Sequence, residues 1–419
     1  MLVEIPYEKW LTESLPGVSE YPIHDPWRLK VMSQNEFYGL TLEEQLYYLG
    51  GFMVLSPTTH NTVSERLRFL PEERAIEIWT DRDLVLPESD GFGAGRQNII
   101  SMGCVVQMGV TAGQCYGLKA EEVMINRSKT IPPYGPDAPR DPRYAPVAKV
   151  IFYPDSEELL GDGYLRAILE RKMMRTRFRT DVRLTEWTIR TMKDHIVDEY
   201  PGLDLHVITD PATKVVIGKF QQRADGFVIE NEGFARELGN WLLPNDNYDL
   251  PRGMRGQEFG LNDAAALRFH QGLKQEIRLG PDEVQGFAGS AYLRMTDASA
   301  IGVITVKKDD IEHQVQAGRA FIDLALFLET WGKAMDVTRA KGEKRGEGIS
   351  DEAIIQGGIS TSVHAALVEV GFANELLQLR LGTRSHPTVV FRMGIPEKRD
   401  RPFAARPYLN EVLLPNEVV

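Results

Sequence analysis

Two stretches of equal length decide the fold: GCVVQMGVTAGQCYG at residues 103–117 and GRAFIDLALFLETWG at residues 318–332. Each begins and ends with glycine and is apolar almost all round, which is typical of a helix buried on every side. Each also follows a strand-like segment that ends in acids, and each precedes a further strand-like segment. The preceding segments are IEIWTDRD (76–83) and VITVKKDD (303–310), and the following segments are AKVIFYP (148–154) and TVVFRMG (388–394).

This repetition predicts an α+β protein in which two related halves are joined in one chain. We expect buried helices over residues 95–118 and 313–332, packed on each other at the centre as equivalent helices would pack in a homodimer. The chain would then be a pseudo-dimer. The expected organisation is an N-terminal arm at 1–40, a first half at 41–170, and a second half at 171–419 that includes an insertion at 245–286 and a C-terminal tail.

Local signals add further elements. A Thr followed three residues later by Glu predicts a capped helix start at Thr41 in TLEEQLYYLGGFMVLSP (41–57). The segment RLRFLPEERAIEIWTD (66–81) predicts two strands around a turn at PEER. We expect helices over 157–178, 185–202 and 225–244, a helix within 359–382, a Pro-rich loop or lid at 129–146 and a charged loop at 339–352.

Composition excludes several classes of function. The 419 residues carry a formal net charge of −12, which argues against nucleic-acid binding and against a polybasic membrane anchor. No signal peptide and no apolar run of about 18 residues is evident, so a transmembrane helix is not expected. The two cysteines, Cys104 and Cys115, would lie about 16 Å apart on one helix, which favours reduced thiols and a cytoplasmic location. The histidines and cysteines show no metal-ligand spacing, so no metal site is expected.

One basic stretch, RKMMRTRFRTDVR at 171–183, stands out in this acidic chain. Guanidinium groups bind phosphate through bidentate, charge-assisted hydrogen bonds. The alternate residues Arg175, Arg177 and Arg179 would face one anion if the backbone there is extended rather than helical. The other interpretation is a solvated basic helix face, with ion pairs to the many acids of the chain.

Taken together, these segments resemble the flavin-dependent nitroreductase family, most closely its fused two-half (Acg-type) branch, over roughly residues 40–410. Four pieces carry the resemblance, in order along the chain. They are LSPTTHNTVSERLRF (55–69), WTDRDLVLPESDGFGAGRQNIISMGCVVQMGVTAGQCYGL (79–118), RTRFR (175–179) and PTVVFRMGIPEKRDRPFAARP (387–407).

The resemblance implies an FMN-dependent oxidoreductase that transfers hydride through the flavin N5 to or from a small organic substrate, with NAD(P)H as a candidate electron donor. In the family the flavin lies across the interface of two subunits. The second half would supply arginines for the phosphate, and the first half would hold the ribityl chain and the pyrimidine edge. These residues are Arg175, Arg177, Arg179 and Arg406 on one side, and Pro57, Thr58, Thr59 and Asn61 on the other. Residues 28–50 contain no second arginine cluster, so one flavin site per chain is expected, in a monomer with an internal pseudo-dimer or in a homodimer.

The chain also departs from the family pattern. Val63, Ser64 and Glu65 replace the family's Gln-Pro-Trp, and Glu65 is either a surface residue or a site residue. His60 is a candidate proton donor to flavin or substrate, with a structural role as the other interpretation. The segments 129–146 and 245–286 could cover the site. The alternative function is therefore a non-catalytic, self-lidded protein that binds flavin or another ligand on the same scaffold.

Overall fold

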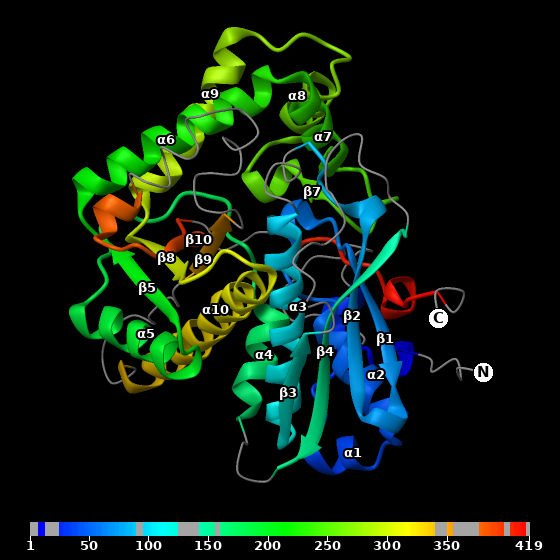
Figure 1. Ribbon diagram of the computed structural model, residues 1–419. Coiled ribbons are helices and arrows are strands. Elements are labelled where there is room, and N and C mark those ends of the chain that lie inside the picture. Colours follow the sequence, from blue (N-terminus) through cyan, green and yellow to red (C-terminus); the bar gives the residue numbers. More distant parts are fainter. Residues whose placement is uncertain are drawn as a thin grey trace.

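The protein contains two antiparallel sheets on either side of a pair of central helices (Figure 1). The computed structural model describes residues 7–12, 25–88, 95–124, 142–155, 160–339, 350–354, 377–397 and 403–415. The first sheet has the order β1 (Glu65–Leu70), β2 (Ala75–Asp81), β4 (Tyr144–Pro154), β3 (Leu118–Met124). The second has the order β5 (Leu203–Ile208), β8 (Ala300–Val306), β10 (His386–Gly394), β9 (Ser350–Ile354).

The two sheets share one topology. In each sheet the strands, counted along the chain, lie in the spatial order first, second, fourth, third, and all pairs are antiparallel. In each, one long central helix follows the second strand. These helices are α3 (Arg96–Cys115) after β2 and α10 (Ile311–Arg339) after β8. The fold is thus a mixture of helices and antiparallel sheets, as the sequence predicted.

Helices α3 and α10 pack directly on each other, which confirms the predicted central pair. Two glycines make the contact possible. A Cβ on Gly103 would fall far inside contact distance of the Val315 carbonyl, and a Cβ on Gly318 would do the same to the Ile100 carbonyl. The contact is reciprocal, because each glycine meets the carbonyl three residues before the other glycine. The Cys104 thiol donates to the Gly318 carbonyl, with 3.3 Å between the heavy atoms. Both cysteines are buried, and neither forms a disulfide in the structure.

The remaining helices pack around the two sheets and the central pair of helices. Helices α6 and α9 lie side by side and, with α7 and α8, form the region at the top of Figure 1. A two-stranded parallel pair, β6 (Leu242–Leu243) and β7 (Met254–Arg255), lies within this region. The bounds of the helices are α1 Gln34–Tyr38, α2 Leu42–Met53, α4 Asp162–Glu170, α5 Glu186–Glu199, α6 Pro211–Glu230, α7 Glu232–Trp241, α8 Asp263–Leu273 and α9 Pro281–Asp297.

Several local predictions are confirmed. Thr41 caps α2 and forms the predicted capping box with Glu44. Strands β1 and β2 form a hairpin around residues 71–74. Helix α5 and strands β4, β8 and β10 also lie where the sequence placed them.

Two helix predictions are wrong. The helix expected over 157–178 ends at Glu170, and the basic stretch that follows is extended. The expected single helix over 225–244 is interrupted, because Asn231 ends one helix and caps α7 by accepting a hydrogen bond from the Phe234 N–H. No element was predicted for residues 212–224, which form most of α6.

Three predictions fall largely outside the described residues. In the expected lid at 129–146, residues 144–146 belong to β4, and 129–141 are not described. In the charged loop, only 339 and the first residues of β9 are described. The helix expected within 359–382 is described only from residue 377 onward, where residues 377–381 are helical.

Candidate functional site

A cavity of about 790 Å³ lies where six parts of the chain meet. Its volume is in the range of small-molecule and cofactor sites, roughly 300–1,000 Å³. The lining comes from the segment after α2, the start of α3, the basic stretch, the region of α6 to α9, β10 with the residues just after it, and the C-terminal tail. The sequence-predicted residues that line it are Pro57, Thr58, Thr59, His60, Asn61, Arg175, Arg177 and Arg406.

The segment after α2 is held by hydrogen bonds to α3. The Thr59 N–H donates to the Ser101 hydroxyl (3.0 Å), and the Thr59 hydroxyl donates to the Gln97 side-chain oxygen (2.7 Å). Three non-glycine residues here adopt positive φ: His60 at 46°, Asn61 at 56° and Val63 at 50°. Such backbone is uncommon for residues with a Cβ, and it persists only where the surroundings enforce it.

Asn61 ties this segment to the insertion and to the tail. Its side-chain amide donates to the Gly253 carbonyl (2.8 Å) and to the Ala405 carbonyl (2.9 Å), and the Gly253 N–H donates back to the Asn61 carbonyl (2.9 Å). Both donor hydrogens of the amide are therefore used within the protein. Only the side-chain oxygen of Asn61 remains for a ligand, so Asn61 can accept a hydrogen bond there and cannot donate one.

The basic stretch is extended because it runs against the end of β10. The Arg179 N–H donates to the Ile395 carbonyl (2.8 Å), and the Glu397 N–H donates to the Arg177 carbonyl (3.0 Å). The fully buried guanidinium of Arg392 adds two more bonds, because it donates to the carbonyls of Met174 and Thr176, both at 3.1 Å. These contacts replace the backbone hydrogen bonds of the helix that was expected.

The three alternate arginines do not converge on one point. Arg175 donates to the Glu258 carboxylate of the insertion (2.7 Å), and Arg177 donates to Asp297 at the end of α9 (2.6 Å). Arg175 and Arg177 both line the cavity. Arg179 is not among the described lining residues, and its guanidinium pairs with Asp181. The extended backbone thus brings two of the three arginines to the cavity.

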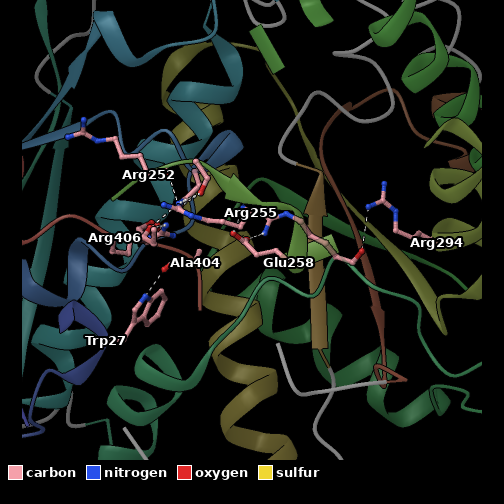
Figure 2. A network of polar contacts seen from close by, with 12 residues as sticks. Trp27, Arg252, Arg255, Glu258, Arg294, Ala404 and Arg406 are labelled. Carbon is pink, nitrogen blue, oxygen red and sulfur yellow. Dashed lines mark hydrogen bonds and ion pairs between the residues drawn. The ribbon is translucent and has the colours of Figure 1, made fainter. Parts of the chain in front are cut away.

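The tail brings Arg406 into the cavity wall. The Trp27 indole N–H donates to the Ala404 carbonyl (2.9 Å), so the N-terminal arm fixes the tail. Arg406 donates to the Ser56 carbonyl (2.9 Å), and its guanidinium lies 5.7 Å from the Trp27 ring centre. Figure 2 shows Arg406 on one side of this polar network and Arg294 on the other, with Arg255 and Glu258 between them.

Burial shifts the protonation of the site. Desolvation, and then the charge of Arg175, lower the pKa of His60 from 6.5 to about 4, so His60 is neutral at pH 7. Desolvation also lowers the pKa of Arg406 to about 10. Glu65 has no exposed surface, so the interpretation of this residue as a surface acid is wrong. Its burial raises the pKa of Glu65, against the opposing charges of Arg406, Arg66 and Arg252.

Several buried polar atoms of the lining have no hydrogen-bond partner. The group consists of His60 Nδ1, Asn61 Oδ1, Thr176 Oγ1, Gln221 Oε1 and Arg406 Nε. Buried polar groups are normally paired, so atoms of this kind in a cavity wall indicate where water or a ligand binds. The set contains both donors and acceptors, and its members are far apart in the sequence, from residue 60 to residue 406.

Sequence reasoning missed much of the lining. Gln221 and Asp225 of α6, Phe234 and Glu237 of α7, and Phe287 of α9 were not singled out. Arg392 lies inside the quoted segment PTVVFRMG but was not named as a site residue. The only indication in the sequence that α6 and α7 would line the cavity was their position beside the predicted insertion. Arg392 could have been flagged, because an arginine in a buried strand must find partners.

The described part of the chain holds no group of three or more His, Cys, Asp or Glu side chains placed to bind a metal ion. Among the helices that the structure describes, none is long and apolar enough to cross a membrane.

The sequence matches no family model, and no curated protein matches it. Several solved structures show similarity, and two of them are nitroreductases. The FMN and NADPH-dependent nitroreductase NfnB from sphigopyxis sp. strain HMH is 14% identical, with a TM-score of 0.34, over 60% of this chain and 98% of that chain. The FMN-dependent nitroreductase NfnB from Mycobacterium smegmatis, in complex with NADPH, is 15% identical, with a TM-score of 0.29, over 61% and 94%. Similarity of this extent does not establish the family of the chain.

Proposed function

We propose that the protein is an FMN-dependent oxidoreductase of the nitroreductase-like type, which transfers hydride to or from a small organic substrate. The observation that carries the proposal is the meeting of two kinds of residue around one cavity. Pro57, Thr58, Thr59 and Asn61 come from one side, and Arg175, Arg177 and Arg406 come from the other. A cofactor with an anionic end and a polar, ring-shaped end needs both kinds of residue.

The residues present fit FMN. Arg177 and Arg406 would meet the phosphate, because Arg177 is half-exposed at the cavity and Arg406 keeps an unpartnered Nε. Asn61 Oδ1 would accept from an N–H or O–H of the ring or the ribityl chain, and Thr176 Oγ1 can donate or accept. Arg179 is left out of the proposed set, because it is not among the residues that line the cavity.

Bound flavin would supply the hydride chemistry through its N5, so no protein nucleophile is needed. The chain's own residues would orient the cofactor and exclude water. His60 is neutral at pH 7, so it would act as a hydrogen-bonding group through Nδ1 rather than as a charged acid. NAD(P)H is the electron donor that we include in the proposal.

We propose further that residues 41–170 and 171–419 are related halves that form a pseudo-dimer within one chain, with 1–40 as an arm and 245–286 as an insertion. The shared strand order and the reciprocal contacts of Gly103 and Gly318 support this. Each half contributes to one cavity, so one cofactor per chain is expected. The free thiols of Cys104 and Cys115 suit a reducing compartment, and we include a cytoplasmic location in the proposal.

One observation favours the alternative, a self-lidded binding protein without turnover. Glu258 belongs to the insertion, is 5% exposed, and already pairs with Arg175. A carboxylate of the chain therefore holds one of the arginines that a phosphate would use. Under this alternative, the Arg175–Glu258 pair keeps the segment 245–286 closed over the cavity, and a bound flavin or other ligand stays unreactive.

Titration of FMN into flavin-free protein tests the proposal. Arg177→Ala removes one charge-assisted hydrogen bond, so the dissociation constant should rise about tenfold or more. The control is Arg179→Ala, which removes an equal charge from outside the cavity lining and should leave the affinity unchanged. Equal affinities in both variants and the wild type, or no FMN binding at all, would refute the proposal. Reduction of bound flavin by NAD(P)H, measured by bleaching of its absorbance, would rule out the alternative.

A further inference from the structure

Glu65, the first residue of β1, is a carboxyl group buried without the usual hydrogen bonds. The residue has no exposed surface. Apart from a contact with its own backbone N–H, neither carboxyl oxygen has a hydrogen-bond partner among the described residues. Buried polar groups are normally paired, and an ionised carboxylate without partners is costly to bury. Glu65 can therefore stay ionised only through the charges that surround it.

Three arginines act on this carboxyl group. In decreasing order of effect they are Arg406 of the tail, Arg66 on the same strand, and Arg252 of the insertion. Arg66 is already matched by the buried Asp81 of β2, with 2.7 Å between nitrogen and oxygen. Arg252 and Arg406 are therefore the cations that balance Glu65, and Figure 2 shows both on the same side of the polar network.

Arg406 connects this buried charge to the cavity. Glu65 is the charge that acts most strongly on Arg406, yet only Arg406 is among the described residues that line the cavity. Two of its N–H groups donate to the carbonyls of Ala405 (3.1 Å) and Ser56 (2.9 Å), and its Nε has no partner. An anion that binds in the cavity at Arg406 would thus share one cation with the Glu65 carboxylate.

We propose that Glu65 is a positioning residue of the anion site, and that it takes up a proton when an anion binds at Arg406. The inference rests on the proposed function, since the anion there would be the phosphate of FMN. Before binding, the ionised Glu65 balances Arg406. The bound anion then takes over this balance and repels the carboxylate, which accepts one proton from solvent and becomes neutral. No covalent bond to the anion forms or breaks.

This coupling gives the affinity for an anion a pH dependence of definite sign. Binding that takes up a proton weakens as the pH rises, by up to about tenfold per pH unit. Burial raises the pKa of Glu65, so the effect should grow through the neutral and alkaline range. The pKa of His60, about 4, and that of Arg406, about 10, lie outside a window from about pH 6 to pH 9.

Sulfate is the probe, because its charge does not change in this window. Calorimetry in two buffers of different ionisation enthalpy measures both its dissociation constant and the protons taken up. We expect the dissociation constant to rise with pH, and proton uptake to approach about one per sulfate toward pH 9. No sulfate binding, or a dissociation constant that does not rise with pH, would overturn the proposal. This measurement uses the unaltered protein, so it decides whether or not a variant folds.

A matched pair of variants assigns the proton to Glu65. Glu65→Gln keeps the shape of the side chain and cannot take up a proton, so its affinity for sulfate should stay constant and exceed that of the wild type about tenfold at pH 9. The control is Glu72→Gln in the exposed turn after β1, which removes an equal charge and should keep the wild-type pH dependence. The same pH dependence in both variants would overturn the proposal.

A separate titration with FMN at pH 7 keeps this inference distinct from the proposed function. Proton uptake with sulfate but no binding of FMN would refute the proposed function and leave the role of Glu65 standing. Binding of FMN together with a sulfate affinity that is independent of pH would do the reverse.

Discussion

Asn61 gives the sharpest test of how the site is held together. Its side-chain amide bonds the carbonyls of Gly253 and Ala405, so a single residue joins the first half, the insertion and the tail. The perturbation that we choose is Asn61→Leu, which keeps the branching of the side chain at Cγ and removes both donors. Asn61 is 2% exposed and has a φ of 56°, so the variant also places a branched apolar residue in left-handed backbone.

The magnitude follows from the partners that remain. The Gly253 carbonyl still accepts from Arg255 (3.3 Å), and the Ala405 carbonyl still accepts from Arg406 (3.1 Å). Neither carbonyl becomes unpaired, so each lost bond costs its net value of about 1 kcal/mol. Left-handed backbone costs leucine about 1 kcal/mol more than asparagine. Asn61→Leu should therefore lower the free energy of unfolding by about 3 kcal/mol, and Asn61→Gly, which tolerates the backbone, by about 2 kcal/mol.

The assay is urea unfolding followed by circular dichroism at pH 7. The control is Asn35→Leu on the exposed face of α1, which should change the free energy of unfolding by less than about 0.5 kcal/mol. If Asn61→Leu behaves like the control, the two hydrogen bonds do not hold the site. If Asn61→Gly costs more than Asn61→Leu, the backbone at position 61 is not strained for a leucine, and the reasoning from φ fails.

Two further predictions concern the central helices and the site's protonation. Gly103→Ala should lower the free energy of unfolding by about 2 kcal/mol or more, because its Cβ meets the rigid backbone of α10. The control is Gly289→Ala on α9, where no heavy atom lies within 4 Å of the new Cβ, and it should raise the free energy of unfolding by about 0.5 kcal/mol. Equal effects of the two variants in urea unfolding would contradict the close approach of α3 and α10. The pKa of His60 in the folded protein, about 4, lies below the ordinary value of 6.5, so the unfolded chain takes up a proton first as the pH falls. The free energy of unfolding should therefore fall by about 3 kcal/mol as the pH drops from 6.5 to 4. This pH dependence should be missing in His60→Gln, and an unchanged pH dependence would show that His60 is not buried as a neutral base.

The central helices could be predicted because their signal is local. The long apolar runs indicated buried helices, and the glycines at 103 and 318, which the repetition had aligned, lie where the two helices meet. The capping box at Thr41 and the hairpin at β1 and β2 were equally local, and both are confirmed. The shared strand order of the two sheets agrees with the repetition seen in the sequence.

The basic stretch could not be predicted in the same way. Residues such as Met173, Arg175 and Arg177 are ordinary helix formers, so local propensity favours a helix. The contacts that extend the chain come from Arg392 and from residues 395–397, more than 200 positions away. Arg179 shows the same difficulty. Its alternate spacing along an extended chain would place it with Arg175 and Arg177, but its guanidinium pairs with Asp181, two residues further along the chain.

The roles of individual site residues were harder still. Asn61 was expected to present its amide to a ligand, yet both donors serve carbonyls at positions 253 and 405. Its contribution to a ligand is reduced to one oxygen. The lining residues on α6 and α7 left no local signature, since Gln221, Asp225 and Glu237 would look the same on a solvated helix face.

The insertion takes part in the site rather than merely covering it. Its Gly253 carbonyl is bonded by Asn61 of the first half, and its Glu258 carboxylate is bonded by Arg175 of the second half. Glu258 is anchored in turn by the Arg255 N–H (2.9 Å), and Arg255 donates to backbone carbonyls of residues 247–253. A segment fixed by this many buried bonds does not swing away as a unit without breaking contacts to both halves. A phosphate entering the cavity would therefore meet Arg175 already held by a buried carboxylate. Arg177 is paired as well, through its Nε to Asp297, but its side chain is 53% exposed, so the phosphate would depend on the remaining guanidinium N–H groups of Arg177 and on Arg406. For this reason the half-exposed Arg177, rather than the better buried Arg175, is the residue whose removal should decide whether the cavity holds FMN.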